Sequence, residues 1–262
     1  MHGHRARKRF GQHFLSDQTV IESLLDCINP RDGEFLIEIG PGLGALTDGL
    51  LQRTASMTAI ELDRDLASRL QKRYDADQLD LIQADALRVD WDALLGQRLA
   101  RIVGNLPYNI SSPLLVRLAQ SCQGVIDQHF MLQREVVQRI VATSGTHYGR
   151  LGILLQAFYH CESVLDVPAS AFTPPPKVES AVVRMIPLPK PRVPDANALS
   201  QLLATAFSQR RKMLRGTLLP WLAQKEIDGS AIDPQARAEQ VSREVYYALA
   251  TQMARQNTKE SS

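Results

Sequence analysis

Cysteine is scarce in this chain, and the three that occur show no pairing pattern. Cys27, Cys122 and Cys161 are far apart, odd in number and outside any C-x-x-C motif. This excludes a disulfide framework and gives no sign of a zinc site, so we predict no metal and a reducing, cytoplasmic setting. Long apolar runs are also lacking. No stretch approaches the ~20 residues of a membrane helix, and no signal peptide follows the basic start, so we expect no membrane partner.

Acidic residues are absent from two segments of a chain whose net charge is only +2. Residues 1–15 and residues 196–225 contain basic residues but no Asp or Glu. Local basic patches on a nearly neutral protein are typical of contacts with nucleic-acid phosphates. A solvated basic helix and a free tail would look the same, and charge alone leaves both interpretations open.

Strand-like and helix-like runs alternate over the first two-thirds of the chain. This alternation predicts an α/β fold, a parallel sheet with helices on both faces. Near residue 160 the pattern changes to two strands around the Pro-rich loop Thr173-Pro174-Pro175-Pro176, which could pair antiparallel at the sheet edge. The expected strands are residues 35–39, 57–62, 79–83, 101–104, 129–133, 160–167 and 178–186, and the expected helices are residues 19–28, 45–52, 66–74, 113–119 and 134–142.

Four prolines between residues 187 and 194 mark a linker. The chain after it has helical spacing, and we expect helices over residues 199–207, 212–222 and 243–253. The sequence therefore predicts two domains, an α/β domain over residues 1–190 and a small helical domain over residues 195–262. Nothing in the sequence demands an oligomer.

A glycine-rich turn, Glu38-Ile39-Gly40-Pro41-Gly42-Leu43-Gly44, follows the first strand of the α/β domain and opens a helix. Glycine lets the backbone approach a ligand where a Cβ would obstruct it. The glycines stand one residue apart, whereas dinucleotide-binding proteins use G-x-G-x-x-G. The compact spacing after an acid resembles the cofactor loop of class I methyltransferases, with Gly40 and Gly42 as contacts to S-adenosylmethionine.

Two acids follow the next two strands. Glu61 lies about 20 residues beyond the loop, where an acid can accept hydrogen bonds from both ribose hydroxyls of a nucleoside. Asp85 follows the third strand, and its resemblance to the same superfamily implies a bond to the adenine amino group. Either acid alone would more simply be a solvated strand end. Their order and spacing on a βαβαβ frame favour a nucleotide-like ligand.

Asn105-Leu106-Pro107-Tyr108 follows the fourth strand and resembles the motif of methyltransferases that act on ring-conjugated amino groups. Such an amine is a poor nucleophile because its lone pair is delocalised. We expect the Asn105 side chain and the Leu106 carbonyl to accept its two N–H bonds, which turns the lone pair toward the methyl group. Pro107 fixes the loop through its locked φ, and Tyr108 would stack on the base. A strand-to-helix turn with a buried tyrosine is the structural alternative.

Longer segments resemble the ribosomal RNA adenine dimethyltransferases. These are Lys8-Arg9-Phe10-Gly11-Gln12-His13-Phe14-Leu15, Asn105-Leu106-Pro107-Tyr108-Asn109-Ile110-Ser111, Met131-Leu132-Gln133-Arg134-Glu135-Val136, Tyr148-Gly149-Arg150-Leu151, Phe172-Thr173-Pro174-Pro175-Pro176-Lys177-Val178-Glu179-Ser180-Ala181-Val182 and Phe207-Ser208-Gln209-Arg210-Arg211-Lys212. The resemblance spans nearly the whole chain and is strongest to the bacterial small-subunit branch. It implies a class I methyltransferase that dimethylates two adjacent adenines in a hairpin loop of small-subunit ribosomal RNA, linked to ribosome maturation, with the small subunit as partner.

The resemblance also assigns site residues by position. His13, Leu15, Gly40, Glu61, Asp85 and Asn105 fall on the family's cofactor contacts, although many members have Asn at the place of His13. Phe172 matches an aromatic that can face the target base, or it could simply anchor the proline loop. Arg210, Arg211, Lys212 and Arg215 are suited to RNA phosphates.

Three other functions remain to be weighed. A related enzyme of the large subunit would share this core, but the Pro-rich loop and the tail favour the small subunit. DNA adenine methylation fits less well, because Asn-Leu-Pro-Tyr replaces the Pro-Pro-Tyr ending common in those enzymes. A ribosome assembly factor with incidental methylation is of another class, and the intact Glu61, Asp85 and Asn105 argue against lost activity.

Overall fold

The computed structural model describes residues 13–107, 110–121 and 124–260, which pack as two compact units. The first unit contains the described residues of Met1–Val137 and of Cys161–Ile186. The second contains Gln138–His160 and the described residues of Pro187–Ser262. The chain thus leaves the first unit once and returns to it before the C-terminal helices begin.

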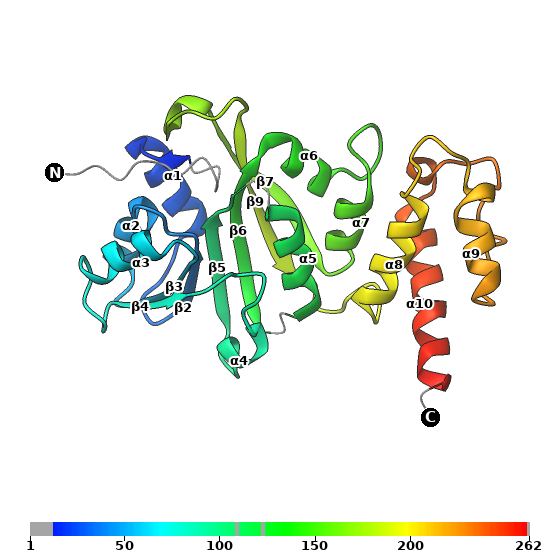
Figure 1. Ribbon diagram of the computed structural model, residues 1–262, viewed down its shortest axis with the longest axis horizontal. Coiled ribbons are helices and arrows are strands. Elements are labelled where there is room, and N and C mark those ends of the chain that lie inside the picture. Colours follow the sequence, from blue (N-terminus) through cyan, green and yellow to red (C-terminus); the bar gives the residue numbers. More distant parts are fainter. Residues whose placement is uncertain (1–12, 108–109, 122–123, 261–262) are drawn as a thin grey trace. The chain divides into compact units, whose positions relative to one another are not determined.

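A seven-stranded mixed sheet forms the frame of the first unit (Figure 1). Strands β4, β3, β2, β5 and β6 lie in this order and run parallel, and β9 adds antiparallel to β6. β7 lies beside β9 at the edge, so the strands that flank the Pro-rich loop are neighbours as expected. The strands are β2 (Phe35–Ile39), β3 (Met57–Glu61), β4 (Leu79–Gln83), β5 (Ala100–Asn105), β6 (Val125–Gln133), β7 (Tyr159–Val167) and β9 (Ser180–Pro187).

The central strands are mostly apolar because both of their faces are covered. Leu36 and Ile37 of β2 and Ile102 and Val103 of β5 are fully buried, and each such side chain contributes roughly 1.5–3 kcal/mol by leaving water. β2 lies between β3 and β5, which are reached by connections in opposite directions. In open α/β sheets, a crevice forms at this point outside the carboxyl ends of the strands.

The helices of this part of the chain are α1 (Gln18–Ile28), α2 (Ala45–Arg53), α3 (Arg64–Gln71), α4 (Trp91–Leu95), α5 (Ser111–Ser121) and α6 (Arg134–Val141), the last of which crosses the border between the units. Several of these helices begin at an aspartate whose side chain caps the helix N-terminus. Asp17 accepts the N–H groups of Thr19 and Val20 at 2.9 and 3.1 Å, and Asp63 caps α3 in the same way. A separate two-stranded sheet pairs β1 (Phe14–Leu15) with β8 (Phe172–Thr173).

The second unit is helical and includes residues that the sequence assigned to the α/β domain. Its elements are α7 (Arg150–Gln156), α8 (Ala196–Ala206), η3 (Leu214–Gly216), α9 (Leu218–Gln224), η4 (Ala238–Gln240) and α10 (Arg243–Glu260). The Tyr148 hydroxyl donates to the Val241 carbonyl at 3.1 Å, and the Tyr247 hydroxyl donates to that of Ile153 at 3.0 Å. These buried bonds, with the buried face of α7, explain why residues 138–160 pack with the C-terminal helices.

The expected helix over residues 212–222 is wrong in its first half, since residues 212–217 are not α-helical, while residues 218–222 belong to α9 as expected. α8 ends at Ala206, residues 207–211 form turns, and a 3₁₀ turn precedes α9. The backbone N–H of Leu214 donates to Ala236 at 2.9 Å and that of Arg215 donates to Pro234 at 3.2 Å. These donors are therefore used for long-range contacts, and a continuous helix through Gly216 would remove those bonds.

Candidate active site

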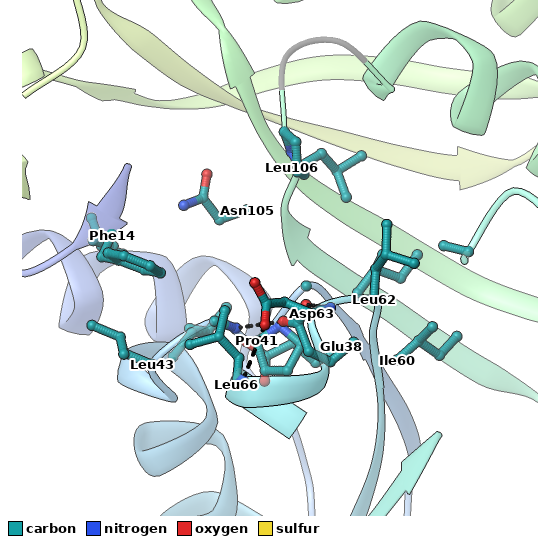
Figure 2. Close-up of a pocket in the computed structure, with 18 of the residues that line it drawn as sticks. Phe14, Glu38, Pro41, Leu43, Ile60, Leu62, Asp63, Leu66, Asn105 and Leu106 are labelled. Atoms are coloured by element: carbon teal, nitrogen blue, oxygen red, sulfur yellow. Dashed lines mark hydrogen bonds between the residues drawn. The ribbon is translucent and has the colours of Figure 1, made fainter. Parts of the chain in front are cut away.

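A pocket opens at the carboxyl ends of β2, β3, β4 and β5, in the first unit (Figure 2). The loop after each strand contributes to its wall, and the β1–β8 pair closes one side. The lining includes every cofactor and catalytic residue expected from the sequence except Tyr108, which lies outside the described residues: His13, Leu15, Gly40, Gly42, Glu61, Asp85, Asn105, Leu106, Pro107 and Phe172. The structure brings these residues together, while their individual roles remain proposals.

The glycine loop needs glycine for two separate reasons. Gly40 and Gly42 have φ of 69° and 61°, in the left-handed region that side chains disfavour. A Cβ on Gly42 would also lie 3.3 Å from the ring of Phe14. The N–H of Gly40 donates to the Ile60 carbonyl at 2.9 Å, which ties the loop to the end of β3. The loop therefore presents bare backbone to the pocket.

Glu61 joins the glycine loop to the start of α3. Its carboxylate accepts the Gly42 N–H at 3.1 Å through one oxygen and the Asp63 N–H at 2.8 Å through the other. The side chain is buried, and this burial raises its pKa against the lowering effect of the two bonds. Each oxygen has a second lone pair, so the group can accept further donors while it holds the loop.

Asp85 follows β4 and lines the same pocket as the glycine loop. It accepts the Leu87 N–H at 3.0 Å, and Arg88 lies 3.8 Å away with a largely exposed side chain. The Ala84 N–H donates to the Glu61 carbonyl at 3.1 Å, so the two acidic strand ends are joined through the backbone. An adenosine bound between them would place its ribose near Glu61 and its amino group near Asp85.

Asn105 is the last residue of β5 and stands at the mouth of the pocket. Its amide nitrogen donates to the His13 carbonyl at 3.4 Å, and Figure 2 shows that nitrogen turned toward the strand that carries Phe14. This bond leaves the amide oxygen available as an acceptor. The Leu106 N–H donates to Met131 at 3.2 Å and the Ile110 N–H donates to Pro107 at 3.1 Å, which fixes the turn after the strand.

His13, Leu15 and Phe172 form the wall contributed by β1 and β8. His13 Nδ1 lies 2.8 Å from the Pro174 carbonyl, and because a carbonyl only accepts, this nitrogen carries the proton. Leu15 pairs with Phe172, and both are buried, at 7% and 3% exposed. Burial of Phe172 within the core favours the anchoring role, although its ring also lines the pocket.

Among the other residues that line the pocket, Glu38, Leu62 and Asp63 were given no role from the sequence. Glu38 is buried, accepts the Thr47 hydroxyl at 2.6 Å, and has its pKa raised to about 7, mainly by burial. Asp63 caps α3, and Leu62 is 51% exposed although it lines the pocket. In the sequence, Glu38 could have been identified by its place just before the glycines of the turn. Leu62 and Asp63 could have been identified because they directly follow Glu61.

The charge of the pocket selects the kind of ligand it can hold. Four acids line it, Glu38, Glu61, Asp63 and Asp85, and its described lining contains no Lys or Arg. A dinucleotide's pyrophosphate would be repelled, whereas a cationic nucleoside with an apolar ring would be favoured. S-adenosylmethionine, with a sulfonium, an ammonium, two ribose hydroxyls and an adenine, fits this donor and acceptor set.

The basic residues of the tail lie in the second unit. Arg210, Arg211, Lys212 and Arg215 are exposed, but they stand on turns and on η3 rather than along one helix. Arg210 donates to the Thr146 carbonyl at 3.0 Å. Over the part of the chain that the structure describes, no group of three His, Cys, Asp or Glu side chains could hold a metal ion, and no helix is long and apolar enough to span a membrane.

Comparisons with known proteins agree with this geometry. Residues 3–255 match the family model described as ribosomal RNA adenine dimethylase. The ribosomal RNA small subunit methyltransferase A of Methylibium petroleiphilum is 55% identical over 94% of this chain and 96% of its own. That of Bordetella pertussis is 53% identical over 95% of both chains.

Solved structures match the fold. A dimethyladenosine transferase from Plasmodium falciparum superposes with a TM-score of 0.75 at 22% identity, over 94% of this chain and 98% of its own. The 23S rRNA methyltransferase ErmE gives 0.68 at 22% identity, over 92% and 99%. The match of the family model over nearly the whole chain, with relatives above half identity, shows that the chain belongs to the ribosomal RNA adenine dimethylase family.

Proposed function

We propose that this protein transfers methyl groups to the exocyclic amino groups of two adjacent adenines in a hairpin loop of small-subunit ribosomal RNA. S-adenosylmethionine is the methyl donor, and the enzyme is an rRNA adenine dimethyltransferase. One observation carries the proposal: the turn Asn105-Leu106-Pro107 lines the same acidic pocket as Gly40, Gly42 and Glu61. An amine-binding turn thus stands beside a site for a cationic nucleoside.

The residues at the pocket mouth can prepare the amine for attack. When bound, S-adenosylmethionine supplies an electrophilic methyl group on a positively charged sulfur. The Asn105 oxygen and the Leu106 carbonyl accept the two N–H bonds of the adenine amine, which favours a pyramidal nitrogen with its lone pair directed at that methyl group. The amine would attack while neutral, its new N–C bond forming as the bond from the methyl group to sulfur breaks, and the surplus proton of the methylated nitrogen would then pass to solvent. The main contribution of these residues is therefore positioning. Pro107 holds the turn, and Tyr108 and Phe172 are the proposed contacts to the base.

The cofactor roles follow from the same pocket. Glu61 accepts the ribose hydroxyls, Asp85 accepts the adenine amino group, and Gly40 and Gly42 admit the ligand to the backbone. His13 and Leu15 close the site from β1, and Asn105 contacts both ligands. In this arrangement, the hydrogen bond that Asn105 donates to the His13 carbonyl orients the catalytic amide.

The substrate is the small ribosomal subunit, and the exposed basic turn of the second unit is the proposed contact to its phosphates. Arg210, Arg211, Lys212 and Arg215 would position the RNA without reading its sequence. The name of the relatives, ribosomal RNA small subunit methyltransferase A, supports this branch over the large subunit. A cytoplasmic location and a link to ribosome maturation belong to this proposal.

The test is to incubate the protein with labelled S-adenosylmethionine and small subunits that lack adenine dimethylation, and to locate the label by mass spectrometry. Dimethyladenosine at two adjacent positions of the small-subunit RNA is the expected result. Methylation of large-subunit RNA or DNA alone would overturn the substrate. Cofactor binding without methyl transfer to any of these would favour an assembly factor instead.

A further inference from the structure

Two side chains that follow α3 reach back to the glycine loop from outside the pocket. α3 ends at Gln71, and the N–H groups of Arg73 and Tyr74 both donate to the Leu70 carbonyl, at 2.9 and 3.0 Å. This tight turn directs the two side chains toward α2. Neither residue lines the pocket, and neither belongs to a motif recognised in the sequence.

Arg73 and Tyr74 converge on one acid and on the loop backbone. The Arg73 guanidinium donates to the Leu43 carbonyl at 3.1 Å through one nitrogen and pairs with Asp48 through the other. The Tyr74 hydroxyl donates to the second Asp48 oxygen at 2.5 Å. The Arg73 guanidinium carbon also lies 5.3 Å from the centre of the Tyr74 ring. We call these three side chains, Asp48, Arg73 and Tyr74, the loop brace.

The loop brace accounts for the third glycine of the turn. Gly44 does not line the pocket, and its φ is 84°. A Cβ there would lie 2.9 Å from the Tyr74 hydroxyl oxygen and 3.2 Å from a Leu70 methyl carbon. Gly40 and Gly42 thus face the ligand, whereas Gly44 allows the brace to pack against the back of the loop.

α3 connects the pocket to the loop brace. At its start, the N–H of the capping residue Asp63 donates to the Glu61 carboxylate, and Leu66 in the first turn lines the pocket. At the other end, Arg73 and Tyr74 hold Leu43 and Gly44. α3 therefore fixes the distance between the strand end that carries Glu61 and the glycine loop opposite it.

We propose that Arg73 and Tyr74 are positioning residues for the cofactor: they hold the glycine loop in its binding conformation before the cofactor arrives. The inference rests on the proposed function, since it takes S-adenosylmethionine as the ligand. A loop ordered in advance loses less conformational entropy on binding, so the brace increases affinity. The Arg73–Asp48 pair is about half exposed, and such a pair adds little to global stability.

The experiment compares Tyr74→Phe and Arg73→Ala with the wild-type protein. Calorimetry with S-adenosylhomocysteine gives Kd, methylation of undermethylated small subunits gives KM for S-adenosylmethionine and kcat, and melting without ligand checks the fold. Tyr74→Phe removes one hydroxyl and keeps the ring. Lys72→Ala is the matched control, because Lys72 is an exposed cation that directly precedes Arg73 in the chain and is not part of the brace. Arg73→Lys keeps a charge for Asp48 but lacks the fork that reaches Leu43 as well.

We expect Kd and KM for the cofactor to rise roughly fivefold to tenfold in Tyr74→Phe and Arg73→Ala, which is the size of one hydrogen bond to a charged group partly screened by water. At saturating cofactor, kcat of both variants stays near the wild-type value. Kd of Arg73→Lys lies between those of the wild type and Arg73→Ala, and Kd of Lys72→Ala equals that of the wild type. Unchanged Kd in the variants, or a lower kcat with unchanged Kd, would overturn the inference alone. Absence of binding by the wild-type protein would instead overturn the proposed function and the inference with it.

Discussion

The half of the pocket around Gly40, Glu61 and Asp85 follows three strands that are consecutive in the chain, whereas the half around Asn105 joins distant segments. We call these the cofactor half and the amine half. In the amine half, Asn105 bonds to the carbonyl of His13, and β1 pairs with β8, whose residues lie more than 150 positions away. The cofactor half can form with the sheet itself, while the amine half requires the amino-terminal segment to dock.

The difference has a functional consequence. Parallel strands place their carboxyl ends at one edge, so the cofactor half is a direct product of the βαβ topology. The amine half depends instead on contacts between distant segments, such as the β1–β8 pair, the Ser16–Thr173 hydrogen bond at 3.0 Å and the Ser16 and Asp17 N–H groups that donate to the Ala171 carbonyl. These long-range contacts therefore set the shape of the half in which the target base is proposed to bind.

The largest expected effect separates the two halves through Asn105. Asn105→Ala removes the side-chain acceptor for the amine, and we expect kcat for methylation of small subunits to fall by about 10²- to 10³-fold, as for loss of an oriented transition-state hydrogen bond. Kd for S-adenosylhomocysteine should change far less. Asn105→Asp keeps oxygen acceptors and should retain part of the rate. If both variants lost cofactor binding to the same degree as activity, the halves would not be separable.

A substitution at Glu61 tests the cofactor half, where the expected loss is in cofactor affinity. Glu61→Ala removes the acceptor for the Gly42 and Asp63 N–H groups as well as for the ribose. We expect Kd for S-adenosylhomocysteine to rise roughly 10- to 100-fold, the cost of one or two bonds to a charged acceptor. Asp80→Ala, which removes an exposed acid from β4, is the charge-matched control. Calorimetry that found equal affinity in Glu61→Ala and the control would remove Glu61 from the cofactor site.

The same division explains which parts of the fold could be predicted from the sequence. The strand ends at Ile39 and Gln83 are where the sequence pattern placed them, because a glycine-rich turn follows the first strand and Ala84-Asp85 follows the other. Glu61 was singled out by its spacing after the glycine loop, whereas the role of Asp85 came from the resemblance to the methyltransferase superfamily. The pairing of Phe14 with Thr173 could not be predicted, since two-residue strands have no periodicity and their contacts are long-range.

Two other features could not be predicted from the sequence pattern. Residues 212–222 have helical spacing, but the N–H groups of Leu214 and Arg215 donate to the carbonyls of Ala236 and Pro234. These tertiary contacts outweigh a weak local preference for helix. The loop brace could not be predicted from the sequence either, because Arg73 and Tyr74 have the pattern of an ordinary exposed helix end. Their role follows only from their contacts with Leu43 and Asp48 in the folded chain. A residue's role beside a ligand can be set by what lies behind the loop it supports.

A third region, the basic turn of the second unit, is proposed to contact the RNA and can be tested apart from both halves of the pocket. Replacing Arg210, Arg211 and Lys212 with Ala should weaken binding of small-subunit RNA by roughly tenfold at moderate salt and flatten the slope of log affinity against log salt by about 2, since each phosphate contact contributes about 0.7 to 0.9 to it. Removing Arg64, Arg69 and Lys72, three exposed cations of or beside α3, is the control for total charge. An identical slope in both triple variants would mean that the turn makes no specific phosphate contact.

The smallest expected effect concerns the pH dependence of the cofactor half. Burial raises the pKa of Glu38 to about 7 from 4.5, with the charges of Glu61 and Asp48 adding to the rise. The group is therefore mostly protonated at pH 6 and mostly ionised at pH 8. An ionised Glu38 attracts a cation in the pocket, so affinity for S-adenosylmethionine should increase with pH through this range, by about fivefold once screening is allowed for.

Glu38→Gln keeps the size of the side chain and an acceptor for Thr47 but cannot ionise. Calorimetric Kd values for S-adenosylmethionine between pH 6 and pH 8 should then become nearly constant. The sign of the effect follows from the raised pKa, because the favourable charge is present above the folded value and is lost as the pH falls through it. A slope that persisted in Glu38→Gln would assign the titration to another group of the pocket. A slope in the wild type with the reverse sign would mean that the cofactor half prefers a neutral Glu38, and that its selectivity for a cation comes from Glu61, Asp63 and Asp85 alone.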